Sequence, residues 1–365
     1  MTEPSSERPR ILIVRLSAIG DVVMASGLIP ALRARWPQAH LAWLVEPAAA
    51  PLLTHNPRLD ELIVWPRGEW RQLWRMHRYA TLLMRFREFR SRLRAGRFDI
   101  ALDTQGLLKS GLWGWLSGAP RRISLIGREG SQHLATERVR RPDETGVPRR
   151  LGSEYRVLAR HLGAADDAFQ PDLAIGAAAR EVARAALRAG SAGLTTSGRY
   201  AVLCPFTTRP QKHWFEDRWI ALARRCRDGG LVPVLLGGPG DRNAAARIAA
   251  GVPGLVNLTG ALKLDESVAV VAEAALLVGV DTGLTHMGSA LNVPTVALFG
   301  STCPYLDPGA PRSSVLYEQL ACSPCRRNPT CGGRYDCMRA LDVDRVHAEA
   351  LRVMALPAPR AEGAR

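Results

Sequence analysis

The stretch Leu276–Gly300, LLVGVDTGLTHMGSALNVPTVALFG, contains the pattern that decides the fold of this chain. Leu276–Val280 is an uninterrupted apolar run, as expected of a strand that is buried on both faces. Asp281–Gly283 ends this run, and the apolar spacing that follows predicts a helix. A second apolar run, Thr295–Phe299, comes next. Strand, turn, helix and strand in this order form a βαβ unit, which predicts a parallel sheet.

The turn inside this unit carries candidate binding residues. Ligands of parallel sheets bind at the carboxyl ends of the strands, where Asp281, Thr282 and Gly283 fall, with His286 one turn later. Free N–H groups at a helix N-terminus attract phosphates. The sequence leaves two interpretations open. In one, the N–H groups, the Thr282 hydroxyl and His286 bind a phosphate while Asp281 binds a sugar hydroxyl. In the other, Asp281 and Thr282 only cap the helix.

The bulk composition limits the class of protein. A chain of 365 residues with 47% hydrophobic residues predicts a folded protein of two domains. We expect no transmembrane helix, because no apolar run reaches 18 residues. The N-terminal MTEPSSERPR lacks the core of a signal peptide, so a cytoplasmic protein is expected.

The net charge of +15 favours anionic partners, which include nucleic acid, a membrane surface and phosphorylated substrates. Arginine supplies all but three of the 49 basic residues, the lysines being Lys109, Lys212 and Lys263. An arginine-rich genome produces the same composition, so the charge by itself does not choose a partner.

The first half of the chain repeats the strand-to-helix pattern. The apolar run Ile11–Leu16 leads into Ser17-Ala18-Ile19-Gly20-Asp21, and a later run ends in Asp103-Thr104-Gln105-Gly106 with Lys109 a turn beyond. The first turn has one glycine, so neither the dinucleotide fingerprint nor the P-loop is present. The carboxylate of Asp21 suits either a general base or a helix N-cap. Pro30 predicts a kink or a late start in the helix that follows.

A strongly basic segment lies between these two turns. Residues 67–97 contain ten arginines and two acidic residues, and the spacing of Leu82, Phe86, Phe89 and Leu93 predicts an amphipathic helix. Trp70 and Trp74 lie just before it. A basic amphipathic helix with tryptophans is typical of a surface that binds a membrane or an anion, and a solvated helix face is the alternative.

The second half is predicted to bind a nucleotide. An Ala- and Gly-rich region with a short strand at Asp172–Ile175 marks the domain boundary, and a strand at 200–205 follows. One strand-end loop contains Thr207, Thr208 and Lys212, and another contains Asp241. Hydroxyls and an ammonium suit a diphosphate, and a carboxylate suits a ribose diol.

These motifs together match a known family. The segments 17–21, 103–110, 207–214 and 281–286 resemble the bacterial lipopolysaccharide core heptosyltransferases of glycosyltransferase family 9. The resemblance covers about Ile11 to Gly300 and is best to the branch that adds the first heptose. It implies an α/β protein of the GT-B type with two facing Rossmann-like domains. We place an acceptor domain at 10–165, a nucleotide-sugar domain at 166–345, and a C-terminal helix and tail at 346–365.

The resemblance also implies an activity and roles for residues. It implies an inverting transfer, without a metal, of heptose from ADP-L-glycero-D-manno-heptose to Kdo–lipid A at the inner face of the inner membrane. Asp21 would be the general base. The residues implied for the donor are Thr207, Thr208, Lys212 and His286 on the diphosphate with Thr282 and Gly283, Asp241 on the ribose, and Asp281 on the heptose. The residues implied for the acceptor are Ser17, Gly20, Gln105, Lys109, Arg67, Arg71, Arg75 and Arg78.

One feature departs from the first-heptose branch. Cys322, Cys325, Cys331 and Cys337 form a C-x2-C-x5-C-x5-C pattern that suits a structural zinc ion or an iron–sulfur cluster. Reduced thiols without a metal are the alternative. The departure leaves a second-heptose or other core sugar transferase open.

A nucleic-acid-binding protein with a cysteine-bound metal module is the alternative from another class. It leaves the strand-end motifs of both halves without a purpose, so we expect no nucleic acid among the partners.

Overall fold

The computed structural model describes residues 8–127, 129–142, 149–190 and 198–357. The chain divides into two compact units. Unit 1 comprises Met1–Asp143 and Gly152–Ala174, and unit 2 comprises Glu144–Leu151 and Ile175–Arg365. The two units thus divide between Ala174 and Ile175, a few residues after the boundary expected between residues 165 and 166.

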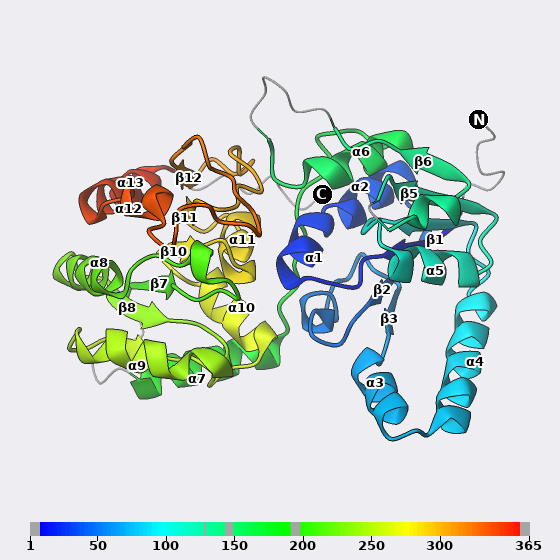
Figure 1. Cartoon of the computed structure of the whole chain (residues 1–365), viewed down its shortest axis with the longest axis horizontal. Coiled ribbons are helices and arrows are strands. Elements are labelled where there is room, and N and C mark those ends of the chain that lie inside the picture. Colours follow the sequence, from blue (N-terminus) through cyan, green and yellow to red (C-terminus); the bar gives the residue numbers. More distant parts are fainter. Residues whose placement is uncertain (1–7, 128, 143–148, 191–197, 358–365) are drawn as a thin grey trace. The chain divides into compact units, whose positions relative to one another are not determined.

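Unit 1 is built on a parallel sheet in the order β3-β2-β1-β4-β5-β6 (Figure 1). Ile11 of β1 pairs with Leu41 of β2 and Ile100 of β4, so β1 is central. Its apolar residues are fully buried, as the uninterrupted apolar run predicts. The strands are β1 (Arg10–Val14), β2 (His40–Val45), β3 (Glu61–Val64), β4 (Ile100–Asp103), β5 (Arg121–Leu125) and β6 (Glu137–Val139).

The helices of unit 1 follow the strands. They are α1 (Ile19–Ala25), α2 (Leu28–Arg35), α3 (Arg67–Arg75), α4 (Tyr79–Ala95), α5 (Leu108–Leu116) and α6 (Ser153–His161), with short 3-10 turns η1 (Ala50–Leu52) and η2 (Ser131–His133). The helix predicted to pass through Pro30 is interrupted before it: α1 ends at Ala25, and α2 begins at Leu28. Pro30 lies in the first turn of α2, where a missing N–H costs no hydrogen bond.

Unit 2 repeats this topology with the sheet order β12-β11-β10-β7-β8-β9. Its strands are β7 (Tyr200–Cys204), β8 (Val232–Leu235), β9 (Val256–Asn257), β10 (Leu276–Val280), β11 (Thr295–Phe299) and β12 (Ser313–Tyr317). Its helices are α7 (Ala177–Gly190), α8 (Glu216–Asp228), α9 (Arg242–Ala250), α10 (Leu264–Ala272), α11 (Gly283–Ala290), α12 (Asp336–Arg339) and α13 (Val343–Ala355), with 3-10 turns η3 (Pro210–Lys212) and η4 (Pro239–Asp241). In both units the strand order corresponds to 3-2-1-4-5-6, the Rossmann arrangement.

The strand predicted at Asp172–Ile175 is wrong. The structure assigns no strand to these four described residues. The backbone N–H of Asp172 donates to Ser26 Oγ at 2.8 Å, and the Asp172 carbonyl accepts from Asn56 Nδ2 at 3.3 Å. The side chains of Ser26 and Asn56 thus form the hydrogen bonds with the Asp172 backbone that a neighbouring strand would otherwise form.

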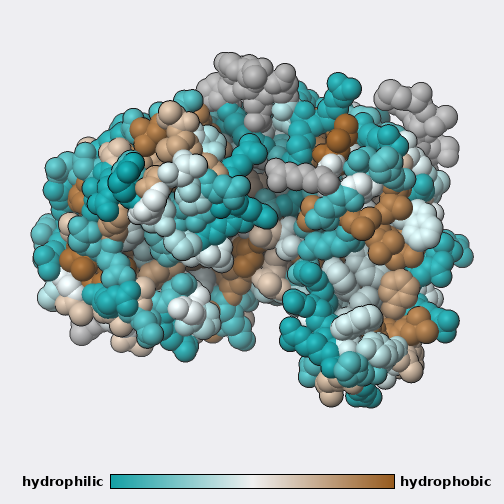
Figure 2. All heavy atoms as spheres, in the orientation of Figure 1, coloured by the Kyte–Doolittle hydropathy of each residue, from teal (hydrophilic) through white to brown (hydrophobic). Residues whose placement is uncertain are grey.

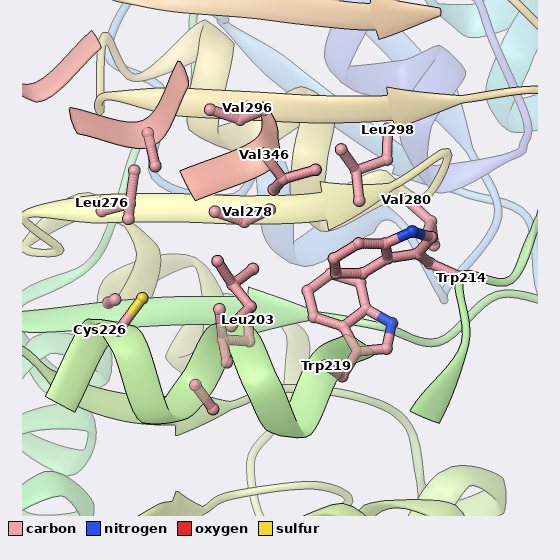
Figure 3. Close-up of a cluster of buried hydrophobic side chains, with 14 of the residues drawn as sticks. Leu203, Trp214, Trp219, Cys226, Leu276, Val278, Val280, Val296, Leu298 and Val346 are labelled. Carbon is pink, nitrogen blue, oxygen red and sulfur yellow. The ribbon is translucent and has the colours of Figure 1, made fainter. Parts of the chain in front are cut away.

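The core of unit 2 lies between the sheet and the helices α8 and α13 (Figure 3). Trp214 and Trp219 meet edge to face at 5.0 Å between ring centroids, and the indole N–H of Trp214 donates to Leu341 O at 2.9 Å. Val346 joins this core from α13. The predicted C-terminal helix therefore packs on unit 2, and the residues of the predicted tail beyond 357 lie outside the described part.

Candidate active site

A cluster of paired polar side chains in the described part of unit 2 lies at its topological switch point. Strands β7 and β10 are neighbours in the sheet, and the chain winds outward from them in opposite directions. The loops after two such strands separate and leave room for a ligand. These loops contain Lys212 and Asp281.

Asp281 is the centre of this cluster. One of its carboxylate oxygens lies 2.6 Å from Lys212 Nζ, and the other lies 3.3 Å from His286 Nε2. Thr302 Oγ1 donates a short hydrogen bond to the carboxylate. The Thr207 hydroxyl donates to the backbone carbonyl of Asp281 at 3.3 Å. The predicted meeting of the loops after β7 and β10 is confirmed by these contacts.

The cluster is largely shielded from solvent. The side chains of Asp281 and Lys212 are 11% and 17% exposed. Burial raises the pKa of Asp281, but the hydrogen bond and charge of His286 and then Lys212 outweigh burial and hold the pKa well below its usual range. Asp281 is therefore ionised in the folded protein at neutral pH.

Two members of the cluster were missed from the sequence. His286 Nδ1 lies 2.9 Å from the hydroxyl of Tyr305, whose side chain is fully buried. Tyr305 and Thr302 both lie on the loop after β11, the neighbour of β10. The signal that points to them is positional, because this loop also follows the carboxyl end of a strand next to the switch point.

The capping interpretation of the turn is not supported. Thr282 is the N-cap residue of α11, but its side chain makes no capping hydrogen bond. The Asp281 side chain is engaged by Lys212, His286 and Thr302 instead. The remaining interpretation, a phosphate site with Thr282 and Gly283, stays a prediction.

Thr208 and Asp241 are not part of this network. Thr208 is exposed, and Asp241 accepts from the backbone N–H of Gly238 at 2.8 Å in its own loop. Because β8 is the other neighbour of β7, Asp241 still lies at the same edge of the sheet as Lys212. Its predicted role on a ribose remains a prediction.

Unit 1 has a second polar cluster at its own switch point, between β1 and β4. Asp21 Oδ2 lies 2.5 Å from Arg15 and accepts from the backbone N–H of Ala18 at 3.2 Å. Arg15 is buried, and it also donates to the Thr104 carbonyl at 3.0 Å. Asp21 thus caps the first turn of α1 while its side chain stays 38% exposed. The two alternatives for Asp21, cap and base, are compatible in this geometry.

The neighbouring acceptor candidates surround Glu46. Its Oε1 accepts from Lys109 Nζ at 3.0 Å and from Arg67 at 3.1 Å, and Lys109 also donates to Ser17 Oγ at 3.3 Å. Gln105 is held by the loop after β1, because its Oε1 accepts from the N–H of Leu16 at 3.2 Å. Glu46 was missed from the sequence, and its place directly after β2 was the available signal.

The other acceptor candidates are differently placed. Gly20 lies in α1, next to Asp21, and is partly buried. Arg71 and Arg75 lie on α3, Arg78 precedes α4, and all three are exposed.

The four clustered cysteines do not form a recognised metal centre. All seven cysteines lie in the described part of the chain and are free of disulfides. Within that part, no group of three or more His, Cys, Asp or Glu side chains is arranged to hold a metal ion. Burial, with a contribution from Cys325, Cys322 and Cys331, raises the pKa of Cys337. A metal at these thiols stays a prediction.

The comparison with known proteins assigns the family. A sequence profile described as glycosyltransferase family 9 (heptosyltransferase) matches residues 86–335. The chain belongs to glycosyltransferase family 9. This family 9 protein is similar to lipopolysaccharide heptosyltransferase 1 of Pseudomonas aeruginosa, with 30% identity covering 88% of this chain and 87% of that protein.

Solved structures agree with this assignment. The E. coli ADP-heptose lps heptosyltransferase II is 25% identical with a TM-score of 0.73, covering 94% of this chain and 98% of that one. The E. coli heptosyltransferase WaaC with ADP-2-deoxy-2-fluoro heptose is 25% identical with a TM-score of 0.70, covering 94% and 99%. The predicted GT-B fold class, family and glycosyltransferase activity are therefore confirmed. Among the described residues, none of the helices combines the length and apolar character that a membrane span requires.

Proposed function

We propose that this family 9 glycosyltransferase moves a heptose from ADP-L-glycero-D-manno-heptose to the Kdo–lipid A inner core of lipopolysaccharide. The single observation that carries the proposal is the largely buried cluster of Lys212, Asp281 and His286 at the switch point of unit 2. Relatives named for heptose transfer, one of them solved with an ADP-heptose analogue, support the choice of donor.

The donor site follows from the charges of the cluster. Lys212 supplies a fixed positive charge, and the N-terminus of α11 adds free N–H groups beside it. Together with the Thr207 and Thr208 hydroxyls and His286, these groups suit a diphosphate. Asp281 and Asp241 are hydrogen-bond acceptors, which suits the heptose and ribose hydroxyls respectively.

Asp21 is the proposed general base. It removes the proton from an acceptor hydroxyl as that oxygen attacks C1 of the heptose, the bond from C1 to the phosphate oxygen breaks, and ADP leaves. Attack on the face opposite the leaving group inverts the anomeric carbon. Negative charge grows on the departing diphosphate, and Lys212 stabilises it there. This assignment gives every step to residues of the chain and requires no metal.

The buried Arg15 positions this base. Its guanidinium lies 2.5 Å from Asp21 Oδ2 and holds the carboxylate in place. Ser17, Gly20, Gln105, Lys109, Arg67, Arg71, Arg75 and Arg78 are proposed for the anionic acceptor.

A second acceptor remains a candidate. The solved heptosyltransferase II matches this chain as closely in identity as the solved WaaC does. Transfer to a core that already carries one heptose is therefore the second candidate function.

The proposed acceptor carries a lipid anchor, which places the enzyme at the inner face of the inner membrane as a peripheral protein. For the cysteine segment we propose a structural zinc ion or iron–sulfur cluster held by Cys322, Cys325, Cys331 and Cys337. Metal analysis of anaerobically purified protein tests it, and a zinc and iron content near background excludes it.

The deciding experiment incubates the enzyme with ADP-heptose and either Kdo2–lipid A or the same acceptor carrying one heptose. Mass spectrometry of the lipid is expected to show one added heptose on Kdo2–lipid A. Addition only to the heptosylated acceptor identifies the second function, and addition to neither refutes both.

A further inference from the structure

Helices α3 and α4 form a hairpin that extends from the sheet of unit 1 and is joined through Met76, His77 and Arg78 (Figure 1). Its base is anchored by aromatic packing. Trp70 lies 6.1 Å from Phe86 and 5.7 Å from Phe89 between ring centroids, and both phenylalanines contact Trp113 of α5. The base of the hairpin thus packs into the core of unit 1, whereas these contacts do not involve its far end.

The far end of the hairpin is unusually apolar for an exposed surface. Twelve large apolar side chains are exposed among the described residues, and five of them fall between residues 74 and 84. We call these five the hairpin tip: Trp74 (62% exposed), Met76 (55%), Tyr79 (47%), Leu83 (48%) and Met84 (49%). The Trp74 and Tyr79 rings meet edge to face at 5.2 Å between ring centroids, so they form an aromatic pair. Such clustering marks an interaction surface more strongly than scattered exposed residues do.

The charge around the tip is predominantly positive. Residues 67–95 contain nine arginines and two glutamates, Glu69 and Glu88. Both glutamates are within ion-pair distance of Arg85. In the described part of the chain no ion pair involves Arg71, Arg75 or Arg78, and all three are exposed beside the tip. The space-filling view shows hydrophilic and apolar residues intermixed over this hairpin (Figure 2).

We propose that the hairpin tip docks into the surface of an anionic phospholipid bilayer. Tryptophan and tyrosine favour the interface between head groups and acyl chains, methionine and leucine favour the acyl boundary, and arginines attract anionic head groups. The tip presents all three kinds of side chain together. A protein partner would need complementary acidic charge, which a bilayer of anionic lipids supplies without a specific fit.

The proposal rests on the proposed function for its purpose, because an acceptor with a lipid anchor lies in a membrane. It is nevertheless distinct from acceptor recognition. The arginines beside the tip serve both, because their charges suit anionic head groups as well as an anionic acceptor, whereas the apolar side chains of the tip contact only the lipid. Docking at the tip holds unit 1 at the membrane surface where such an acceptor is found.

Vesicle co-sedimentation tests the docking without any acceptor. The full-length protein is mixed with vesicles of phosphatidylglycerol and phosphatidylethanolamine, or with phosphatidylcholine vesicles. We expect binding to the anionic vesicles that weakens with salt. The variant Met76→Ser/Leu83→Ser/Met84→Ser should bind at least about tenfold more weakly, because three apolar side chains no longer enter the bilayer.

A second variant, Arg75→Gln/Arg78→Gln, should weaken binding to anionic vesicles about 25-fold, at about fivefold per arginine. The matched control is Leu108→Ser/Leu112→Ser/Trp115→Ser, which removes three comparably exposed apolar side chains from α5. The control should bind vesicles like the wild type. Because all replaced apolar side chains are exposed, thermal melting should confirm that the variants are folded.

Several results overturn the proposal. Absence of vesicle binding does so, as does an equal loss in the α5 control or an unchanged Met76/Leu83/Met84 variant. A dimer in light scattering that this variant converts to a monomer identifies the tip as a self-association surface instead.

An activity measurement separates docking from the proposed function. The apolar variant should retain transfer to a deacylated, water-soluble acceptor and lose transfer to the acylated form of this acceptor in vesicles. If the wild type transfers heptose to neither acceptor, the proposed function is contradicted, and the vesicle-binding result alone decides the docking.

Discussion

The ion pair between Lys212 and Asp281 leads to the most specific prediction about this enzyme. Lys212→Met keeps the length of the side chain but removes the ammonium that lies 2.6 Å from Asp281. Breaking a buried ion pair by removing one partner costs about 3–5 kcal/mol, because the other charge remains buried. His286 and Thr302 still contact Asp281, so the lower end, about 3 kcal/mol, is expected.

The magnitude can be measured as a change in the free energy of unfolding. For a domain of the size of unit 2, about 3 kcal/mol corresponds to a Tm lower by roughly 6–12 °C. Urea denaturation and calorimetry should both detect this difference. The matched control is Lys263→Met, which removes an exposed lysine of the same unit and should change stability by less than about 0.5 kcal/mol.

A double variant tests whether the cost arises from the unpaired carboxylate. Lys212→Met/Asp281→Asn removes both charges and should be more stable than the sum of the two single changes by at least about 2 kcal/mol. ADP should raise the Tm of the wild type and not that of Lys212→Met, if Lys212 binds the diphosphate. Additive single effects, or a cost below about 1 kcal/mol for Lys212→Met, refute the reasoning.

Four further predictions concern single features of the two sites. Asp21→Asn should keep the fold and lower turnover about 10²–10⁴-fold because the base is lost; wild-type turnover would leave Asp21 as a cap only. Tyr305→Phe removes the hydroxyl partner of His286 Nδ1 and should lower the free energy of unfolding by about 1–2 kcal/mol and raise the donor KM; an unchanged KM argues against a positioning role. The stability advantage of the wild type over Asp281→Asn should be complete above about pH 4 and shrink as the pH falls, because the folded state holds this pKa below its unfolded value; an advantage that persists in acid contradicts the pairing. Gly279→Ala places a Cβ 2.2 Å from a side-chain atom of α11 and should destabilise the protein by about 1–3 kcal/mol in urea denaturation; a neutral effect would mean that α11 moves freely on β10.

The positions of Asp281 and Lys212 at the binding edge of the sheet could be predicted from the residues that precede them in the chain. The run Leu276–Val280 predicted β10, and the turn after it predicted a binding residue at Asp281, which the structure surrounds with three polar partners. Lys212 could be placed at the same edge of the sheet, since it also follows a buried strand. In parallel sheets this inference is reliable because all carboxyl ends of the strands point in one direction.

The residues that sequence reasoning missed act through partners that are distant in the chain. Tyr305 orients His286 from the loop after another strand, and Glu46, directly after β2, pairs with Lys109 of α5. The wrong strand at Asp172–Ile175 has the same origin, because Ser26 and Asn56 satisfy a backbone whose local pattern resembles a strand. None of these pairings has a signal in the spacing of neighbouring residues.

The amino-acid sequence by itself determined the alternation of strands and helices, the parallel sheets and the strand ends at which polar residues gather. These features depend on the periodicity of apolar residues and on local turn chemistry. Only the tertiary structure decided that Asp281 pairs with Lys212 and His286. It also decided that Asp21 forms an ion pair with the buried Arg15, and that the apolar tip of the α3–α4 hairpin stays exposed. The reason is that pairing and exposure depend on which segments the folded sheets bring together, and the order of residues along the chain does not contain those distances.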